Sequence, residues 1–291
     1  MSWRTVVISG RCKLDLKMGY MVVRAEETRR IYLDEIAVLM IENPAVSMTC
    51  ALLSALTEKK IKVIFCDAEH SPQAEIVPYY GCHDSSRKIN MQLSWHENIK
   101  GAVWGVIIAD KIRKQADMLA KHGRLAAAEL VYSYIDQLEF QDASNREGHA
   151  AKVYFNALFG KEFSRSADSP INSALNYGYT VMLSAFNREI AANGYITQLG
   201  LHHGNVFNRF NLSSDLMEPF RILVDAEVYA LKPQELNKDT KRPLYALLNN
   251  FIFIDGTKQT VLNAISIYCK SVFDALNKAD PELVKLPAYE L

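Results

Sequence analysis

The sequence predicts an α+β protein, in which a small N-terminal β-sandwich-like domain precedes a larger all-α domain. Up to about residue 78, β-branched residues alternate or form short runs between turn residues. After about residue 85, apolar residues recur at the spacing of helices. The 291 residues are 49% hydrophobic, which suffices for two cores of modest size. We therefore expect a β-rich domain at 1–80, a linker at 81–87 and an α-helical domain at 88–291.

The first domain is expected to contain several strands and one short helix. Strands are predicted in TVVISG, KLDLKMGYMVVRAE and RRIYLDEIAVLMIE. VSMTCALLSALTEKK has helical spacing and leads into the apolar strand IKVIFCD, after which DAEHSPQ supplies a turn. A helix followed by a buried strand closes this unit.

The second domain is predicted to be helical throughout. Residues 88–120 and the segment LAAAELVYSYIDQLEF have helical spacing, as do most segments between 145 and 291. Turn residues separate the helices at DSP, ANG, LKPQ and KRP. Residues 94–97, SWHE, are expected on a helix surface, and GCHDSS near residue 83 is the expected domain boundary.

The charge balance argues against indiscriminate binding of polyanions by the whole surface. Lysines and arginines number 33, as do aspartates and glutamates, so the net charge is zero. A local basic stripe is still possible, because attraction to phosphate depends on where the charges lie. Modest basic clusters are interpreted as solvated faces, with a DNA track as the alternative. They are Lys111, Arg113 and Lys114; Lys121 and Arg124; and Lys238, Lys241 and Arg242.

Cysteine spacing and hydropathy indicate a soluble, cytoplasmic protein. The five cysteines are scattered without a C-x-x-C pair, which excludes a zinc ribbon and a redox dithiol. The N-terminus lacks a signal peptide cleavage pattern, and no stretch of about twenty apolar residues could span a membrane. Phosphate-loop and dinucleotide-binding motifs are also missing, so nothing supports the use of a nucleoside triphosphate or a dinucleotide.

The first candidate site lies in LGLHHGNVFNRFNLSSDLMEPFR, residues 199–221. Asp215 and Glu218 lie three apart, so on a helix they share one face. Asp215 and the two serines before it are also favoured N-cap residues, and Asp-x-x-Glu is a capping-box variant. Spacing alone favours capping, although a helix start can also present acids to a cleft. Arg221 follows Glu218 by three residues and could orient that acid or contact phosphate.

Glu147, in DASNREGHAAKVYF, has the same two interpretations. Ser144 lies three residues before it, which makes a Ser-x-x-Glu capping box ahead of a helical run. However, Gly148, Ala150 and Ala151 leave little bulk around the carboxylate, as an approaching ligand would need. Taken alone, the pattern favours capping.

Two adjacent histidines, His202 and His203, precede the acids of residues 199–221. Adjacent side chains point in different directions, so at most one histidine is expected to bind a given ion, and spacing does not choose between them. Glu147, one histidine and Glu218 would supply two carboxylates and an imidazole. Such a set suits Mg²⁺ or Mn²⁺, and the imidazole favours Mn²⁺. Zinc usually takes more nitrogen or sulfur ligands.

Three blocks of sequence, in this order, resemble the Cas1 family, the CRISPR-associated integrases of spacer acquisition. NREGHAAKVYFNALFG resembles the family's glutamate-bearing helix, and DSPINSALNYGYTVML resembles its helix with asparagine and tyrosine. LGLHHGNVFNRFNLSSDLMEPFRILVD is similar to its Gly-x-x-His stretch followed by Asp-Leu-Met-Glu. The N-terminal half, from WRTVVIS to IKVIFCD, also resembles the family's β domain. The third block is most similar to the type II branch.

The resemblance implies that Glu147, His203 and Glu218 are the catalytic residues and the ligands of Mg²⁺ or Mn²⁺. The family's histidine follows the glycine by three residues, which selects His203 and leaves His202 without an assigned role. Supporting residues around the cleft are Asp215, Asn172 and Arg221.

The resemblance also implies partners and a reaction. Family members are homodimers, and two dimers flank a dimer of a small ferredoxin-like partner, Cas2, in a heterohexamer. The complex holds a short foreign double-stranded DNA, the prespacer, and joins its 3′-hydroxyl ends to the leader-side and spacer-side ends of a CRISPR repeat. Other type II adaptation and effector proteins are further implied partners.

Two other hypotheses use the same residues. A stand-alone metal-dependent DNA endonuclease acting on branched DNA would need water as the nucleophile and no 3′-hydroxyl donor. In a non-enzymatic scaffold, the Ser-x-x-Glu and Asp-x-x-Glu groups would only cap helices. The ordered blocks favour the integrase over both.

Overall fold

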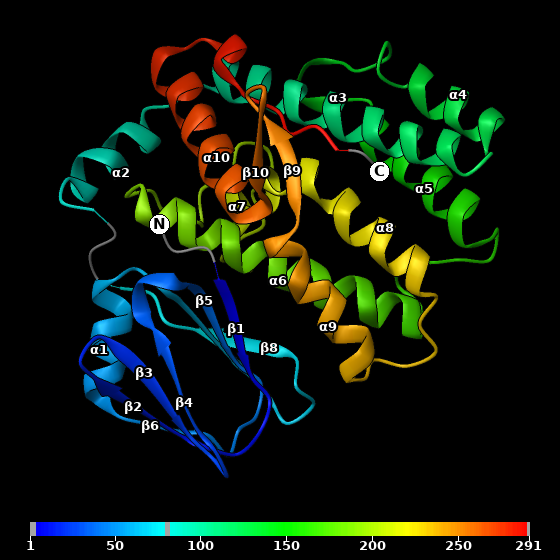
Figure 1. Ribbon diagram of the computed structural model, residues 1–291. Coiled ribbons are helices and arrows are strands. Elements are labelled where there is room, and N and C mark those ends of the chain that lie inside the picture. Colours follow the sequence, from blue (N-terminus) through cyan, green and yellow to red (C-terminus); the bar gives the residue numbers. More distant parts are fainter. Residues whose placement is uncertain (1–3, 79–81, 290–291) are drawn as a thin grey trace.

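The computed structural model describes residues 4–78 and 82–289, and it has the two-part architecture that the sequence predicts (Figure 1). A strand-rich N-terminal domain lies against one side of a larger, mostly helical domain. The α+β fold class is therefore confirmed. No helix within the described ranges is long and apolar enough to cross a membrane.

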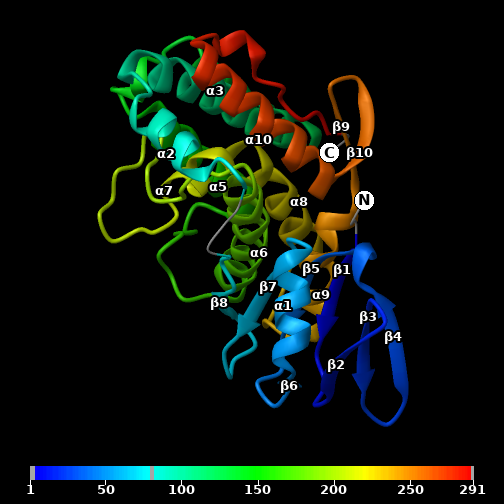
Figure 2. The same cartoon turned by 90° about the vertical axis from the view of Figure 1, so that its left-hand side faces the viewer.

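Within residues 4–78, two four-stranded sheets form a sandwich (Figure 2). One sheet has the order β4-β3-β2-β6, with bounds Thr28–Tyr32, Tyr20–Arg24, Lys13–Lys17 and Ser47–Met48. The other has the order β1-β5-β7-β8, with bounds Arg4–Ile8, Ile36–Ile41, Lys62–Cys66 and Pro72–Glu75. Helix α1, Cys50–Glu58, contributes Leu52 and Leu56 to the core that both sheets share.

Strand β5 lies between two cores, which explains why all six of its residues are buried. Val38 and Met40 belong to the core of the helical domain, whereas Leu39 and Ile41 belong to the core of the sandwich. Successive side chains of a strand point to opposite faces, so from Val38 to Ile41 each core receives alternate residues. The continuous apolar run IAVLMI is typical of a strand that is covered on both faces.

The helical domain is built around a shared core to which the long helices α3, α6 and α10 contribute. Helix α6 begins where the DSP motif predicts, since the Ser169 hydroxyl accepts a hydrogen bond from the backbone N of Asn172 (3.2 Å). The helices are α2 Ser85–Leu93, α3 Glu97–Lys121, α4 Leu125–Ser133, α5 Arg146–Phe159, α6 Pro170–Ala192, α7 Asn211–Leu216, α8 Arg221–Leu231, α9 Lys238–Ala246 and α10 Val261–Lys278. Short 3-10 turns occur at Leu33–Glu35, Phe140–Asp142, Glu218–Phe220, Leu247–Asn249 and Pro281–Leu283.

The helical run expected over residues 88–120 is broken at residues 94–96, between α2 and α3. The expectation that residues 94–97 form a helix surface is wrong for residues 94–96, whereas Glu97 is exposed at the start of α3. Trp95 is 8% exposed, and its Nε1 donates a hydrogen bond to Oδ1 of Asn277 in α10 (2.9 Å). His96 then caps α3, because its Nδ1 accepts a hydrogen bond from the backbone N of Asn98 (3.2 Å).

The second domain is mostly rather than entirely helical. Strands β9, Phe251–Ile254, and β10, Thr257–Thr260, form an antiparallel hairpin. Asp255 and Gly256 connect them with φ values of 51° and 70°, which is the conformation of a type I′ turn. Asp-Gly between alternating residues is a hairpin signal, and the all-α prediction missed it.

Polar contacts join the two domains. Lys241, expected on a solvated face, is only 3% exposed, and its ammonium donates hydrogen bonds to the carbonyls of Glu69 and His70, both 2.9 Å. Strand β8 ends at Glu75, and α2 begins at Ser85, inside the expected linker. The domain boundary stays a prediction, since residues 79–81 lie outside the described residues.

Gly178 lies where α6 crosses α8, and it yields the first testable prediction. A Cβ added there would lie 2.5 Å from Cγ1 of Val224, a fully buried side chain with little rotamer freedom. We expect Gly178→Ala to lower the free energy of unfolding by about 1–3 kcal/mol through overpacking, as measured by urea denaturation. Combined with Val224→Ala, the loss should be smaller than the sum of the two single losses. Strictly additive losses would contradict this packing.

Candidate functional site

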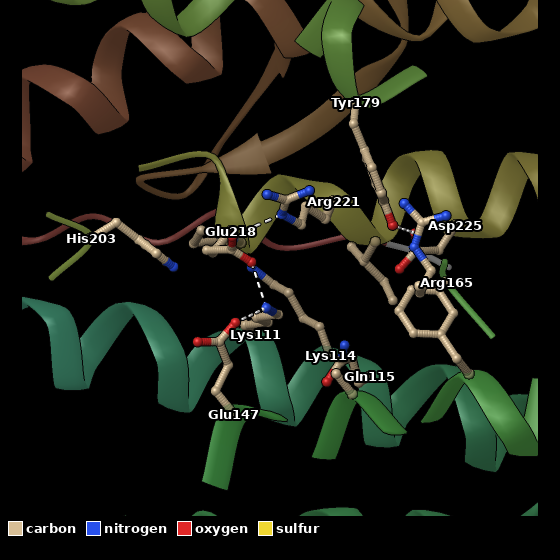
Figure 3. Close-up of a pocket in the computed structure, with 14 residues that line it drawn as sticks. Lys111, Lys114, Gln115, Glu147, Arg165, Tyr179, His203, Glu218, Arg221 and Asp225 are labelled. Carbon is tan, nitrogen blue, oxygen red and sulfur yellow. Dashed lines mark hydrogen bonds and ion pairs between the residues drawn. The ribbon is translucent and has the colours of Figure 1, made fainter. Parts of the chain in front are cut away.

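A cavity of about 250 Å³ lies in the helical domain, where α3, α5 and α8 approach one another. Acidic and basic side chains face each other across it (Figure 3). Glu147, His203 and Glu218, far apart in the sequence, all line this cavity. The other lining residues are Lys111, Lys114, Gln115, Ala151, Phe155, Arg165, Tyr179, Pro219, Arg221, Ile222 and Asp225.

Glu147 lies in the first turn of α5, but a different acid caps that helix. The carboxylate of Asp142 accepts hydrogen bonds from the backbone N of Arg146 (2.7 Å) and of Glu147 (3.0 Å). The expected capping box with Ser144 is wrong, because that hydroxyl bonds to a carbonyl of the preceding loop. The Glu147 side chain instead reaches α3, where its Oε1 lies 2.5 Å from Nζ of Lys111.

Glu218 is the first residue of the 3-10 turn that follows α7, and Pro219 is the next residue of that turn. Proline has no N–H to donate, so the α-helical pattern cannot continue through it. The Glu218 side chain is 3% exposed, and its Oε1 accepts a hydrogen bond from Nε of Arg221 (2.8 Å). Its Oε2 lies 2.5 Å from Nζ of Lys111 as an ion pair, yet accepts no well-aligned hydrogen bond from any described residue.

The ammonium of Lys111 therefore lies between the carboxylates of Glu147 and Glu218, as Figure 3 shows. Burial alone would lower the pKa of Lys111, but the two carboxylates raise it above its usual value. Burial likewise opposes ionisation of Glu218, but Arg221 and Lys111 together hold its pKa below the usual range. Lys111 and Glu218 are thus both charged near neutral pH.

Asp215 fixes the loop that carries the histidines. It is fully buried, and its Oδ2 accepts hydrogen bonds from the backbone N of Leu201 (2.6 Å) and of His202 (3.0 Å). Its Oδ1 accepts from the backbone N of His203 (3.4 Å) and from the Nδ1 of the same residue. A Cβ added at Gly200 would lie 2.7 Å from Oδ2, so glycine permits this close approach. The capping interpretation of Asp215 is wrong, because it lies within α7.

The two adjacent histidines have different surroundings. The ring of His202 stacks on Trp104, with centroids 4.6 Å apart and planes 4° apart, which gives this residue a packing role. The ring of His203 is directed towards the carboxylates (Figure 3). Since Nδ1 of His203 bonds to Asp215, Nε2 is the nitrogen that can bind an ion. The same hydrogen bond raises the pKa of His203 above its usual value.

The chemistry of these donors fits a hard divalent cation. Two carboxylates and one imidazole suit Mg²⁺ or Mn²⁺, and metal-binding histidines usually donate their second N–H to a carboxylate, as His203 does to Asp215. Oε2 of Glu218 is a buried oxygen with spare acceptor capacity. The placement differs from a formed metal site, however. Among the described residues no three acidic, histidine or cysteine side chains converge on one point, and the Lys111 ammonium lies between the carboxylates.

The three supporting residues contribute in different ways. Arg221 and Asp215 contact Glu218 and His203 directly. Asn172, expected close to the cleft, does not line the cavity. Its Nδ2 instead donates hydrogen bonds to two backbone carbonyls of the preceding loop, both 2.7 Å, and its Oδ1 accepts from Arg165, which does line the cavity. Asn172 is therefore placed to fix the loop that carries Arg165.

Several residues of the cavity were not predicted from the sequence. Lys111 and Lys114 are 8% and 7% exposed, so their interpretation as a solvated face is wrong. A signal was present, since Lys111, Lys114 and Gln115 have helical spacing within an apolar segment. Arg165 had no local signal, whereas Tyr179 lies in the block DSPINSALNYGYTVML that resembles the family's helix with asparagine and tyrosine.

Asp225, seven residues after Glu218, lines the same cavity. Burial raises the pKa of Asp225 to about 6. Its carboxylate accepts hydrogen bonds from the hydroxyls of Tyr179 and Tyr154, the latter at 3.1 Å. These two hydrogen bonds connect α5 and α6 to α8 beside the cavity.

Comparison with known proteins identifies the family. Residues 5–264 match the family described as CRISPR associated protein Cas1. Over 293 residues the chain is 33% identical to the CRISPR-associated endonuclease Cas1 of Neisseria meningitidis serogroup C (strain 8013), covering 99% of this chain and 96% of that protein. The chain belongs to the Cas1 family, which confirms the resemblance seen in its sequence.

Solved structures share the fold. A casposase bound to integration product has a TM-score of 0.76 at 17% identity, covering 96% of this chain and 92% of that chain. A Cas6-RT-Cas1–Cas2 complex also has a TM-score of 0.76 at 18% identity, covering 99% of this chain and 36% of that chain. This chain therefore shares its fold with both solved structures.

The pairing of Asp215 with His203 predicts a pH-dependent stability. Because the pKa of His203 is raised in the folded state, its protonated ring stabilises that state. This stabilisation is fully present below the ordinary histidine pKa of about 6.5, and it is lost as the pH rises through the raised pKa. Asp215→Asn removes the charge that raises this pKa. We expect Asp215→Asn to lower the free energy of unfolding by about 1–3 kcal/mol, because the backbone hydrogen bonds to this side chain become weaker. This decrease should be greater at pH 6 than at pH 9.

Urea denaturation at both pH values, in the presence of a metal chelator, measures this difference. His203→Ala provides the control, because adding Asp215→Asn to it should cost the same at both pH values. An equal loss for Asp215→Asn at pH 6 and pH 9 in the presence of His203 would contradict the pairing.

Proposed function

We propose that this protein is a metal-dependent DNA integrase of CRISPR spacer acquisition. In the proposed reaction it joins the 3′-hydroxyl ends of short foreign DNA to a CRISPR repeat by transesterification. The observation that carries the proposal is that Glu147, His203 and Glu218 line one cavity. Membership of the Cas1 family supports it, as does the shared fold with a casposase bound to integration product.

In this proposal, Glu147, Glu218 and Nε2 of His203 hold Mg²⁺ or Mn²⁺. The bound cation would offset the negative charge that develops at the phosphorus and the leaving oxygen. Arg221 orients the Glu218 carboxylate through its hydrogen bond to Oε1. Asp215 keeps the proton of His203 on Nδ1, so that Nε2 remains available as a ligand.

The reaction exchanges one phosphodiester bond for another. The oxygen of a 3′-hydroxyl attacks the phosphorus in line and forms a new P–O bond, while the bond to the existing 3′-oxygen breaks. The attacking hydroxyl loses its proton and the leaving oxygen gains one. No external energy source is needed, in agreement with the missing phosphate-loop motif. Arg165 supplies positive charge at the cavity for the DNA backbone.

The proposed assembly follows from the family. We propose that residues 1–80 serve dimerisation, that residues 88–291 form the catalytic domain, and that the homodimer binds double-stranded prespacer and repeat DNA. Cas2 is the proposed partner in a heterohexamer, supported by the likeness to a Cas6-RT-Cas1–Cas2 complex. Other type II adaptation and effector proteins are further proposed partners. We propose that the protein acts in the cytoplasm.

Removing any of the three ligands should abolish integration. We expect Glu147→Gln, His203→Ala and Glu218→Gln each to reduce strand joining by at least about 100-fold, since even second-shell partners of a metal contribute about 10–100-fold. The assay combines the purified protein, its candidate Cas2, a labelled prespacer and a repeat-bearing plasmid in Mn²⁺. Glu129→Gln, on the exposed side of α4, is the matched control and should retain activity. Cooperative unfolding shows that a variant is folded. If a folded variant of Glu147, His203 or Glu218 has full integration activity, the substituted residue is not one of the ligands.

A prespacer with blocked 3′ ends separates the integrase from a stand-alone endonuclease. Transesterification needs the 3′-hydroxyl as nucleophile, so blocked ends should stop product formation. Hydrolysis uses water and would continue on branched DNA. Persistent metal-dependent cleavage without any joining of unblocked ends would contradict the proposed function.

A further inference from the structure

Lys111 is placed where the proposed metal site needs a cation. Its ammonium lies 2.5 Å from Oε1 of Glu147 and 2.5 Å from Oε2 of Glu218. We propose that Lys111 takes the place of the divalent cation in the metal-free protein, and that the ammonium leaves this position when the metal binds. The inference rests on the proposed function, because it requires Glu147 and Glu218 to be metal ligands.

An ammonium and a metal ion cannot occupy this position together. Both carboxylate oxygens lie 2.5 Å from Nζ, so they are at most 5.0 Å apart (2.5 + 2.5). Mg²⁺ binds carboxylate oxygens at about 2.0–2.1 Å, which draws two such oxygens to within roughly 4 Å of each other. The ion would therefore lie between the oxygens, close to the present position of Nζ. Binding of the metal requires Lys111 to move.

The two carboxylates need a cation when no metal is bound. Glu218 is 3% exposed and Glu147 is 20% exposed, so water screens them poorly. Arg221 contacts Oε1 of Glu218, and Lys111 is the cation that contacts both acids among the described residues. Without it, two like charges would face each other at short range, which is costly in a buried site.

Lysine suits a position that must be vacated. Its single charge is carried on a flexible four-carbon chain, whereas the planar guanidinium of arginine holds carboxylates in fixed geometry. The adjoining cavity of about 250 Å³ gives the ammonium room to turn away from the carboxylates. The displaced charge would remain in a cavity that the proposed function assigns to DNA phosphates.

Lys114 provides the matched control on the same helix. It lines the same cavity and is equally buried, but its ammonium pairs with Asp110 and lies over the ring of Tyr289 (4.5 Å to the centroid). It contacts neither proposed ligand. Lys114→Met therefore removes the same charge as Lys111→Met without clearing the position between the carboxylates.

The test is the affinity of the full-length protein for Mn²⁺ alone, measured from the electron paramagnetic resonance signal of the free ion. We expect Lys111→Met to bind Mn²⁺ at least about tenfold more tightly than the wild type, because no ion pair has to be broken. Lys114→Met should change the affinity by less than about threefold, since its charge lies outside the ligand pair. Lys111→Arg should show no gain, and Glu218→Gln should abolish the gain of Lys111→Met. Equal or weaker binding by Lys111→Met would overturn the inference, as would a gain that survives Glu218→Gln.

Thermal unfolding gives a second measurement if Lys111→Met is unstable without metal. In chelator, both Lys111→Met and Lys114→Met should unfold at lower temperature than the wild type. Added Mn²⁺ should raise the unfolding temperature of Lys111→Met more than that of the wild type or Lys114→Met. Equal shifts in all three proteins would overturn the inference.

The inference and the proposed function fail in different ways. If the wild type integrates DNA only with metal, but Lys111→Met binds Mn²⁺ no more tightly, only the role of Lys111 is wrong. If neither the wild type nor any variant binds Mn²⁺ at this cavity, the metal site of the proposed function fails and the inference fails with it.

Discussion

The contact of one ammonium with two carboxylates determines how the candidate site is organised. Lys111 comes from α3, Glu147 from the start of α5, and Glu218 from the turn before α8. Buried carboxylates are stable only when paired, so these three segments must approach each other for either acid to remain charged. The site is thus coupled to the packing of the helices around it.

A second constraint positions the imidazole. Asp215 accepts hydrogen bonds from three successive backbone N–H groups and from the ring of His203. One buried carboxylate therefore sets both the course of the loop and the orientation of the ring. Gly200 allows that carboxylate to approach the backbone, which provides a physical reason for the Gly-x-x-His spacing. His202 packs against Trp104, so the two adjacent histidines have separate roles.

Much of the fold could be predicted because it depends on local patterns. The apolar run of β5 and the DSP start of α6 are recognisable from a few residues each. The break before α3 could not be predicted, since it depends on the contact of Trp95 with Asn277, 182 residues away. The β9–β10 hairpin had a local signal in Asp255 and Gly256. It was overlooked because the segments around it have the apolar spacing of helices.

The site was only partly predictable for a related reason. Glu147 and Asp215 match capping patterns, but in the structure each carboxylate finds a tertiary partner that the local pattern does not contain. The family resemblance supplied what the spacing left open, namely the choice of His203. The helical spacing of Lys111 within an apolar segment was a signal of its burial, but its contact with Glu147 and Glu218 could not be predicted, because those two acids are distant in the sequence.

The most direct measurement is the anomalous X-ray scattering of Mn²⁺ in crystals of the full-length protein. The account predicts one strong peak in the cavity, ligated by Glu147, Glu218 and Nε2 of His203, with the ammonium of Lys111 turned away from both carboxylates. A peak bound elsewhere, or a cavity in which Lys111 still joins the two carboxylates at saturating Mn²⁺, would contradict it.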